Sequence, residues 1–159
     1  MDALAELEAI RQLKYRYLRG VDTKDWALVR ATLTPDCVSA YDQGHYAFEG
    51  ADAIVDFLET TLGHAGVVSL HQVHHPEIEL LSETRARGRW YLVDYVINAG
   101  SGHPVMPDRV ELHGAAFYED EYAKQGDQWR ISRTGYERTF EQMRPLPLQG
   151  HRFRSRWTA

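Results

Sequence analysis

The hydrophobic repeat of this 159-residue chain changes its period near residue 67, and this change limits the folds that the chain can adopt. Before it, apolar residues recur at steps of three and four, which is typical of amphipathic helices. After it, apolar and polar residues alternate, which is typical of strands with one buried face. Helices followed by a run of strands predict an α+β domain.

The first third of the chain predicts three helices, at residues 3–19, 25–33 and 51–62. We expect the first helix to stop at Gly20, because glycine commonly ends helices. Either Asp22 or Thr23 can cap the second helix, since both side chains accept hydrogen bonds from backbone N–H groups. The third helix should stop at Gly63.

We expect four long strands after the change of period, at residues 67–80, 85–98, 109–123 and 128–140, with a short hairpin near residues 37–49. Strands of ten or more residues exceed the usual length of about five or six, so the sheet must twist and curve strongly. The prediction is a cone-shaped barrel, in which three N-terminal helices close a strongly curved, mostly antiparallel sheet. A pocket should remain between the first helix and the sheet, and ligands prefer such concave sites.

Composition and charge exclude several classes of protein. A hydrophobic fraction of 43% and a charged fraction of 26% support a packed core and exclude a disordered chain. The formal net charge of -5 at pH 7 argues against a nucleic-acid partner. No apolar run approaches the roughly 18 residues of a membrane helix, so we expect no membrane partner. The acidic, amphipathic start of the chain is unlike a secretory signal.

The cysteine content indicates the cellular setting. The single cysteine, Cys37, cannot form an internal disulfide and matches no metal-site spacing, so we expect a reducing, cytoplasmic setting.

The length fits one domain, which we place at residues 1–145, followed by a C-terminal tail at residues 146–159. We interpret the three arginines of this tail as a solvated or subunit-contacting end: Arg152, Arg154 and Arg156.

One face of the predicted strand at residues 85–98 carries an aspartate among large apolar residues. Trp90, Leu92, Asp94 and Val96 share this face, and it is the more apolar of the two, so it should face the interior. Aspartate is rarely buried without a partner. Asp94 therefore either pairs with another group or stays protonated, and both conditions are typical of reactive sites.

The preceding strand, at residues 67–80, can supply a partner for Asp94. His71 and His75 lie on one of its faces and His74 lies on the other. Both faces are mixed, so alternation alone leaves open which of them points inward. We expect no metal site, because His71 and His75 lie two pleats apart and no matching acidic partner is visible.

The end of the first helix offers two further candidates, Tyr17 and Asp22. Five residues on a continuous helix turn two side chains about 140° apart, so these two reach one pocket only if the helix ends near Gly20 and the chain bends there. The alternatives are that Asp22 caps the second helix and that Tyr17 is a core aromatic residue. The residues alone leave both readings open.

Several segments of the chain resemble the SnoaL-like proteins of the nuclear transport factor 2-like superfamily. They span about residues 5–140 and read YLRGVDTKDW (17–26), HQVHHPEIEL (71–80), ARGRW (86–90) with Asp94, GAAFYEDEY (114–122) and QWRI (128–131). The resemblance implies a cone-shaped α+β barrel. It also implies enzymes such as scytalone dehydratase, bile acid dehydratase, a hexachlorocyclohexane dehydrochlorinase, steroid isomerase and polyketide cyclases. These act without a metal or organic cofactor on hydrophobic, often ring-shaped substrates.

The resemblance also implies roles for single residues. In the dehydratase and dehydrochlorinase branches a histidine on the first long strand pairs with an aspartate at the end of helix one, and His71 and Asp22 match those positions. Tyr17 and Asp94 match positions used in the bile acid dehydratase branch. An arginine near the end of the last strand is used there too, and Arg138 is the nearest candidate.

Two features depart from the family pattern. Alternation places Arg138 with Arg130 and Ser132, away from the core, unless a bulge shifts the strand. Scytalone dehydratase uses a second histidine where this chain offers Asp94 or Val96, so its full site is absent and its substrate is not expected. His113 is interpreted as a structural histidine, while His74 and His75 are not favoured as site residues and their roles stay open.

The leading hypothesis is a cofactor-independent lyase that eliminates water, or a similar leaving group, from a small hydrophobic cyclic substrate. His71 would be the base, oriented by Asp22, while Tyr17 donates a hydrogen bond and Asp94 donates a proton or orients a neighbour. The expected substrate contacts are Arg138, Trp90 and Leu92.

Two alternatives stay open. The same base could serve an isomerase or a polyketide-cyclase-like enzyme. The chain could also be a non-catalytic module for ligand binding or assembly, such as the β subunits of ring-hydroxylating dioxygenases. Because Tyr91, Tyr95 and Phe117 should lie on exposed strand faces, we expect a homo-oligomer, either a dimer or a trimer.

Overall fold

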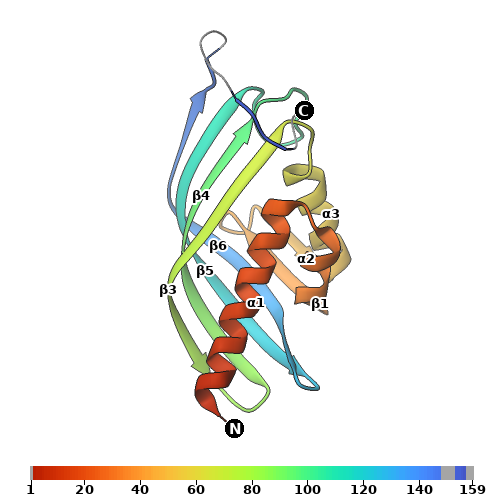
Figure 1. The fold of residues 1–159 in the computed structure, drawn as a ribbon, viewed down its shortest axis with the longest axis vertical. Helices are drawn as coiled ribbons and strands as arrows, with labels where there is room; N and C mark the ends of the chain where they lie inside the picture. The colour runs from red at the N-terminus through yellow and green to blue at the C-terminus, as the bar shows by residue number, and fades with distance from the viewer. Residues whose placement is uncertain (1, 148–152, 157–159) are drawn as a thin grey trace.

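Three helices lie on one side of a six-stranded sheet in the computed structural model, which describes residues 2–147 and 153–156 (Figure 1). The helices are α1 (Ala3–Thr23), α2 (Trp26–Thr32) and α3 (Ala51–Leu62). The strands are β1 (Leu33–Tyr41), β2 (Tyr46–Glu49), β3 (Val67–Leu80), β4 (Arg85–Asn98), β5 (Val110–Gln125) and β6 (Gln128–Pro145). The α+β class is confirmed. The bounds of α3, β3 and β4 are those expected from the sequence.

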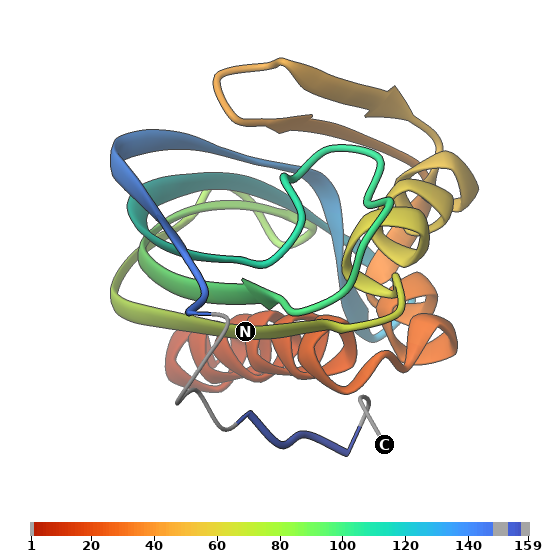
Figure 2. The same cartoon turned by 90° about the horizontal axis from the view of Figure 1, so that it is seen from above.

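The sheet is strongly curved but does not close on itself. Its strand order is β2-β1-β6-β5-β4-β3, and all pairs are antiparallel except β1 with β6. In the described part of the chain, the edge strands β2 and β3 do not pair with each other. As expected from the sequence, it is the three helices that cover the opening that the sheet leaves (Figure 2). The concave face is therefore buried by α1 and α3 and not by another strand.

The first helix does not stop at Gly20. It continues to Thr23, and Lys24 ends it with a left-handed backbone, at φ 57°. Gly20 is instead a packing position, because a Cβ built there would lie 2.8 Å from Cγ2 of Val29 in α2. The glycine therefore permits α2 to fold back closely against the end of α1.

The cap of the second helix also differs from the prediction. The side chain of Asp25, and not that of Asp22 or Thr23, accepts a hydrogen bond from the backbone N–H of Leu28, at 3.0 Å. Asp22 is thus an internal residue of α1, in its last turn. Its carboxylate is available for contacts with the sheet.

Two bulges in β6 change which of its side chains face the concave side. Tyr122 pairs with Ile131 and Glu121 with Arg133, so Ser132 is an extra residue. Ile131 is buried on the inner face before this bulge, and the inner face passes to the even-numbered residues after it. Arg138 therefore points inward, which corrects the outward orientation that simple alternation predicts.

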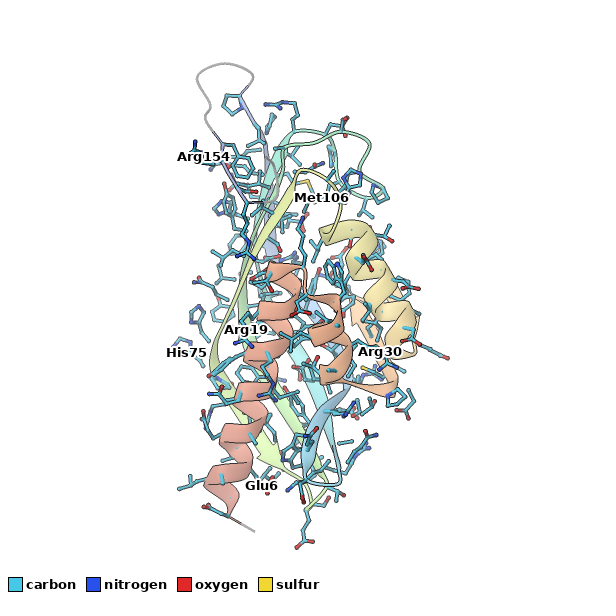
Figure 3. All side chains as sticks on the ribbon, turned by 45° about the vertical axis from the view of Figure 1, so that its right-hand side comes forward. Glu6, Arg19, Arg30, His75, Met106 and Arg154 are labelled. Atoms are coloured by element: carbon cyan, nitrogen blue, oxygen red, sulfur yellow. The ribbon has the colours of Figure 1, made fainter. Side chains whose placement is uncertain are left out.

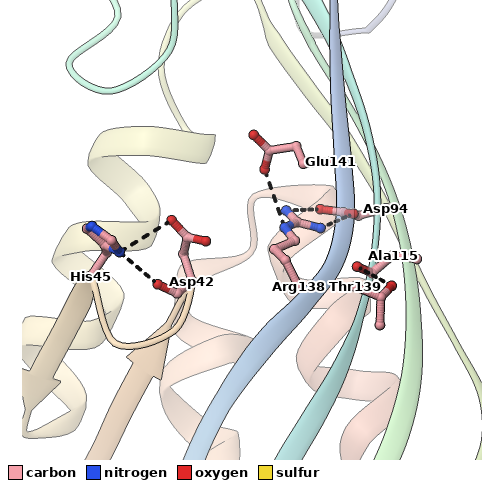
Figure 4. Close-up of polar contacts among 7 residues, drawn as sticks. All are labelled: Asp42, His45, Asp94, Ala115, Arg138, Thr139 and Glu141. Carbon is pink, nitrogen blue, oxygen red and sulfur yellow. Dashed lines mark hydrogen bonds and ion pairs between the residues drawn. The ribbon is translucent and has the colours of Figure 1, made fainter.

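β6 has a second bulge, three residues beyond Tyr136, which is the first residue of this strand to line the cavity. Ala116 pairs with Arg138 and Ala115 with Phe140, so Thr139 is the extra residue. Its hydroxyl donates to the backbone carbonyl of Ala115, at 3.1 Å (Figure 4). Beyond it the odd-numbered residues Glu141 and Met143 line the cavity.

A buried ion pair joins the middle of α1 to the sheet. Nζ of Lys14 lies 2.7 Å from a carboxylate oxygen of Asp120, and neither side chain is exposed. Asp120 also accepts hydrogen bonds from the hydroxyls of Tyr122 and Thr134, at 2.9 and 2.8 Å. The Lys14 ammonium lies 3.4 Å from the ring centroid of Tyr118. These contacts satisfy charges that would otherwise oppose folding.

The outer face of the sheet carries exposed aromatic residues. The rings of Tyr91 and Phe117 stack with centroids 4.7 Å apart, and Val93 and Phe140 are also exposed nearby. The homo-oligomer expected from this face stays a prediction. So does the domain boundary after residue 145, because Arg152 and most of the tail lie outside the described residues. No helix of the described part is long and apolar enough to cross a membrane.

We predict that Gly20→Ala destabilises the fold by about 1–3 kcal/mol, although alanine favours helix more than glycine does. The added methyl must displace the backbone or the Val29 side chain of α2. Urea unfolding would measure this change for Gly20→Ala, Val29→Ala and the double variant. The cost of Gly20→Ala should be smaller when Val29 is already alanine. Equal costs in both backgrounds would contradict this packing role.

Candidate active site

A cavity of about 270 Å³ lies between the helices and the concave face of the sheet. Its walls are largely aromatic: Phe57 of α3 stacks on Tyr41 and Tyr46, and Tyr136 packs against Tyr41 and Tyr118. Such a cavity suits a small apolar ligand with a few polar groups. The ionisable side chains that line it include His71 of β3, Asp94 of β4 and Arg138 of β6.

The imidazole of His71 and the carboxylate of Asp22 form a direct pair. Nδ1 of His71 lies 2.6 Å from Oδ1 of Asp22, and the two side chains are 10% and 18% exposed. The backbone N–H of His71 donates to Oδ2 and the hydroxyl of Ser69 donates to Oδ1, both at 2.8 Å. Three donors thus fix this carboxylate. The face of β3 that points inward is the one that carries His71.

This pairing determines which ring nitrogen is available for chemistry. Because the Asp22 carboxylate accepts from Nδ1–H, the neutral imidazole carries its lone pair on Nε2. None of the described residues forms a hydrogen bond with Nε2 of His71, and the residue lines the cavity. Asp22 itself does not line this cavity. It lies behind the ring, in a separate depression between α1 and β3 that His71 also lines.

Asp94 pairs with Arg138 beside the histidine. Nη1 and Nη2 of Arg138 donate to the two oxygens of Asp94, at 2.6 and 2.8 Å, and Nε lies 3.4 Å from a carboxylate oxygen of Glu141 (Figure 4). A two-pronged contact of this kind suits an ionised carboxylate. Asp94 is 4% exposed and is the cross-strand partner of His71. This geometry favours an orienting role for Asp94 over proton donation.

The space for this ion pair is provided by Gly114. This glycine lies opposite Asp94 on β5. A Cβ built there would lie 2.7 Å from Oδ1 of Asp94 and would collide with Nη1 of Arg138. A side chain at this position is therefore incompatible with the pair as it stands.

Tyr17 lines the cavity but contacts neither Asp22 nor His71 through a hydrogen bond in the described part. Its hydroxyl bonds instead to that of Tyr41, at 2.8 Å, and both rings are almost fully buried. Two hydroxyls that share one hydrogen bond retain one proton that can be donated elsewhere. Burial raises the pKa of both tyrosines well above the usual value, so they act as donors and not as bases.

Two of the expected substrate contacts lie elsewhere. Trp90 and Leu92 are fully buried in the core and do not line the cavity. The indole N–H of Trp90 donates to the hydroxyl of Tyr122, at 2.8 Å. The twist of β4 explains the difference, because its inward row passes from the core at Trp90 to the cavity at Asp94 and Val96.

His75 and His113 lie away from the cavity. His75 lies on the exposed side of β3, at a bulge where its backbone is left-handed (Figure 3). His113 packs against Tyr95 on the outer face of the sheet, with the two rings tilted. Within the described residues no group of three or more His, Cys, Asp or Glu side chains could hold a metal ion.

Sequence reasoning missed several cavity residues. Tyr41 and Tyr136 gave no signal, because a tyrosine in a strand is usually a packing residue. His103 lies in the segment between β4 and β5, where no periodic pattern exists. Only the exchange of inner and outer rows at the bulges could have indicated Tyr136, and nothing in the sequence marks the bulges.

An open, curved sheet covered by three helices, with polar groups gathered at its concave face, defines the nuclear transport factor 2-like fold. A family model for the SnoaL-like domain matches residues 2–135. The chain belongs to the SnoaL-like domain family.

Several solved structures share this fold. A protein from Novosphingobium aromaticivorans DSM 12444, provisionally assigned as a scytalone dehydratase, is 22% identical with a TM-score of 0.76, over 94% of this chain and 97% of that one. The hexachlorocyclohexane dehydrochlorinase LinA-type3 from Novosphingobium barchaimii LL02 is 18% identical with a TM-score of 0.74, over 97% of each chain. A provisionally assigned aromatic ring hydroxylase from N. aromaticivorans is 17% identical with a TM-score of 0.76, over 92% and 96%. At these identities the likeness establishes the fold.

We predict that at least five of the nine tyrosines stay protonated in the folded protein at pH 11. Burial raises the pKa of Tyr136 to about 12 and holds Tyr17, Tyr41, Tyr118 and Tyr122 well above 10. Above pH 10 the unfolded chain loses protons that the native state keeps, so stability should fall as the pH rises. Tyrosinate absorbance followed together with circular dichroism would test this. Smooth ionisation of all nine with the fold intact would contradict it.

Proposed function

We propose that this protein is a cofactor-independent lyase that eliminates water, or a similar leaving group, from a small hydrophobic cyclic substrate. The observation that carries the proposal is the contact of the His71 imidazole with the Asp22 carboxylate beside an aromatic cavity. The relatives described as a dehydratase and a dehydrochlorinase support an elimination.

The base in this proposal is Nε2 of His71. It takes the proton from the carbon next to an activating group, the electrons of that C–H bond form the new double bond, and the leaving group departs with the electrons of its own bond. Asp22 is a positioning residue, since it fixes the tautomer of His71 and stabilises the imidazolium that forms. The imidazolium then returns its proton to the departing hydroxyl, which leaves as water.

The Tyr17–Tyr41 pair supplies the hydrogen-bond donor. Its spare O–H proton would polarise a substrate carbonyl and stabilise negative charge as the C–H bond breaks. A donor that stays protonated to high pH suits this role, because it is a hydrogen-bonding group under all ordinary conditions. Arg138, held by Asp94, would contact a second polar group of the substrate.

The test compares wild type, His71→Gln, Asp22→Asn and a control, His113→Asn on the outer face, against a panel of cyclic β-hydroxy ketones. Elimination yields an enone, whose ultraviolet absorbance reports turnover. We expect His71→Gln to lower kcat by about 10²–10⁴-fold and Asp22→Asn to lower it by a smaller factor, with KM little changed. The control should behave as wild type. Imidazole added to His71→Ala should restore part of the rate.

The outcomes separate the candidate functions. Migration of a double bond without loss of a leaving group would assign an isomerase that uses the same base. Binding of the panel without turnover would favour a non-catalytic ligand-binding or assembly module. Full turnover by His71→Gln would remove the proposed base. The homo-oligomer and the cytoplasmic setting remain part of the proposal and need separate measurement.

A further inference from the structure

The segment of residues 99–109, between β4 and β5, passes between the curved sheet and α3 in the view from above (Figure 2). Val105 and Met106 line the cavity from this segment, and Met106 packs on a small apolar cluster of Val67, Val96 and Leu112. Met106 lies near the end of α3 (Figure 3). We call residues 99–109 the roof segment. Its position determines how much of the cavity is closed.

One imidazole connects the roof segment to the helix beside it. Nε2 of His103 lies 2.9 Å from the backbone carbonyl of Thr61, in the last turn of α3. Among the described residues this is the one hydrogen bond between the roof segment and α3. The other hydrogen bonds of the segment stay within it or join it to the turn before β3, to Asn98 at the end of β4 and to residues 146 and 147 after β6. The Ala99 N–H, for example, donates to the Gly66 carbonyl at 3.0 Å.

The other ring nitrogen organises the segment itself. Nδ1 of His103 accepts the backbone N–H groups of Val105 and Met106, at 3.0 and 2.8 Å. An atom that accepts two N–H donors carries no proton of its own, so Nε2 carries the proton and donates to Thr61. All three contacts therefore require one neutral tautomer. A proton on Nδ1 would replace the accepting lone pair with a donor facing two other donors.

We propose that His103 is a positioning residue that holds the roof segment over the cavity, and that it does so only while its imidazole is neutral. The function concerns closure of the cavity and does not depend on the chemistry of the His71–Asp22 pair.

The surroundings of the ring agree with a neutral state. Burial lowers the pKa of His103 below the usual histidine value, the Thr61 carbonyl acts in the opposite direction, and His64 lowers it further. The ring of His64, from the turn after α3, lies 5.1 Å away and faces it edge-on. Asp108, from the roof segment, favours the charged form but is itself bonded to the Gly102 N–H. Since the closed segment disfavours the proton, closure is stable at neutral pH and weakens as the pH falls.

The test measures amide hydrogen exchange at Val105 and Met106 from pH 7.5 to pH 5, as protection factors corrected for intrinsic exchange. In wild type we expect protection of both amides to fall by about three- to thirtyfold as His103 is protonated. Amides of the central strand β5 serve as the internal reference. Constant protection at both residues across this range would overturn the proposal.

Two substitutions at the same position separate the two ring nitrogens. In His103→Asn the side-chain oxygen replaces Nδ1 as acceptor but nothing titrates, so protection of Val105 and Met106 should persist without pH dependence. In His103→Gln the amide group can reach Thr61 but no acceptor remains for the two N–H groups, so protection should be lost at every pH. Wild-type exchange in both variants would overturn the proposal, and His113→Asn is the matched control.

A binding readout reports closure itself. The probe is 2-naphthol, which is uncharged over this pH range and is titrated by its fluorescence. We expect its Kd to rise about three- to tenfold in His103→Gln at pH 7.5. Unchanged affinity in that variant would contradict the roof function. His71→Gln should retain the pH dependence of roof exchange, so this test can succeed or fail separately from the proposed elimination.

Discussion

Three charged residues spaced eight apart hold α1 against the concave face of the sheet. Glu6 accepts from Nζ of Lys124 and from the indole N–H of Trp129, Lys14 pairs with Asp120, and Asp22 binds His71. Eight residues of helix advance about 12 Å, so the three contacts lie near the beginning, middle and end of α1. An open sheet cannot bury its own inner face. The cavity exists because these three contacts set the distance of α1 from the sheet and its rotation about its own axis.

These contacts differ in the free energy that is lost when their charged groups leave water. Lys14 and Asp120 lose all hydration, and their mutual attraction offsets this only because two hydroxyls and an aromatic face complete the site. An apolar pair of the same volume could be equally stable, but it would not define one register of helix against sheet. Asp22 combines two roles, since the carboxylate that orients His71 is also the attachment of the last turn of α1. Changes at this position therefore alter geometry and chemistry together.

The sequence predicts the elements well because their signals are local. The change of period near residue 67 locates β3 and β4, and alternation on β4 identifies Asp94 as an inward residue. The pairing of His71 with Asp22 was accessible only through the family resemblance. Local signals fail where a contact with a residue farther along the chain determines the role of a residue. Gly20, for example, permits close packing on Val29 and does not end the helix.

The buried Lys14–Asp120 pair shows the same limit of local reasoning. A lysine on helix one and an aspartate on β5 look like solvated charges until the two elements are brought together. The bulges of β6 are similar, because the extra residues Ser132 and Thr139 resemble their neighbours in composition. Arg138 could be placed inward only after the pairing of β5 with β6 was known.

The two bulges also affect how the lining of such a cavity can change during evolution. Between Ser132 and Thr139 the even-numbered row of β6 supplies the lining, and after Thr139 the odd-numbered row does. A one-residue deletion elsewhere in β6 that is absorbed by loss of a bulge would shift the register between the two points and exchange the inner and outer rows there, while the pairing beyond them could be kept. Single-residue insertions and deletions in this strand are therefore a short evolutionary route to new ligands, because one genetic event resets several wall positions together.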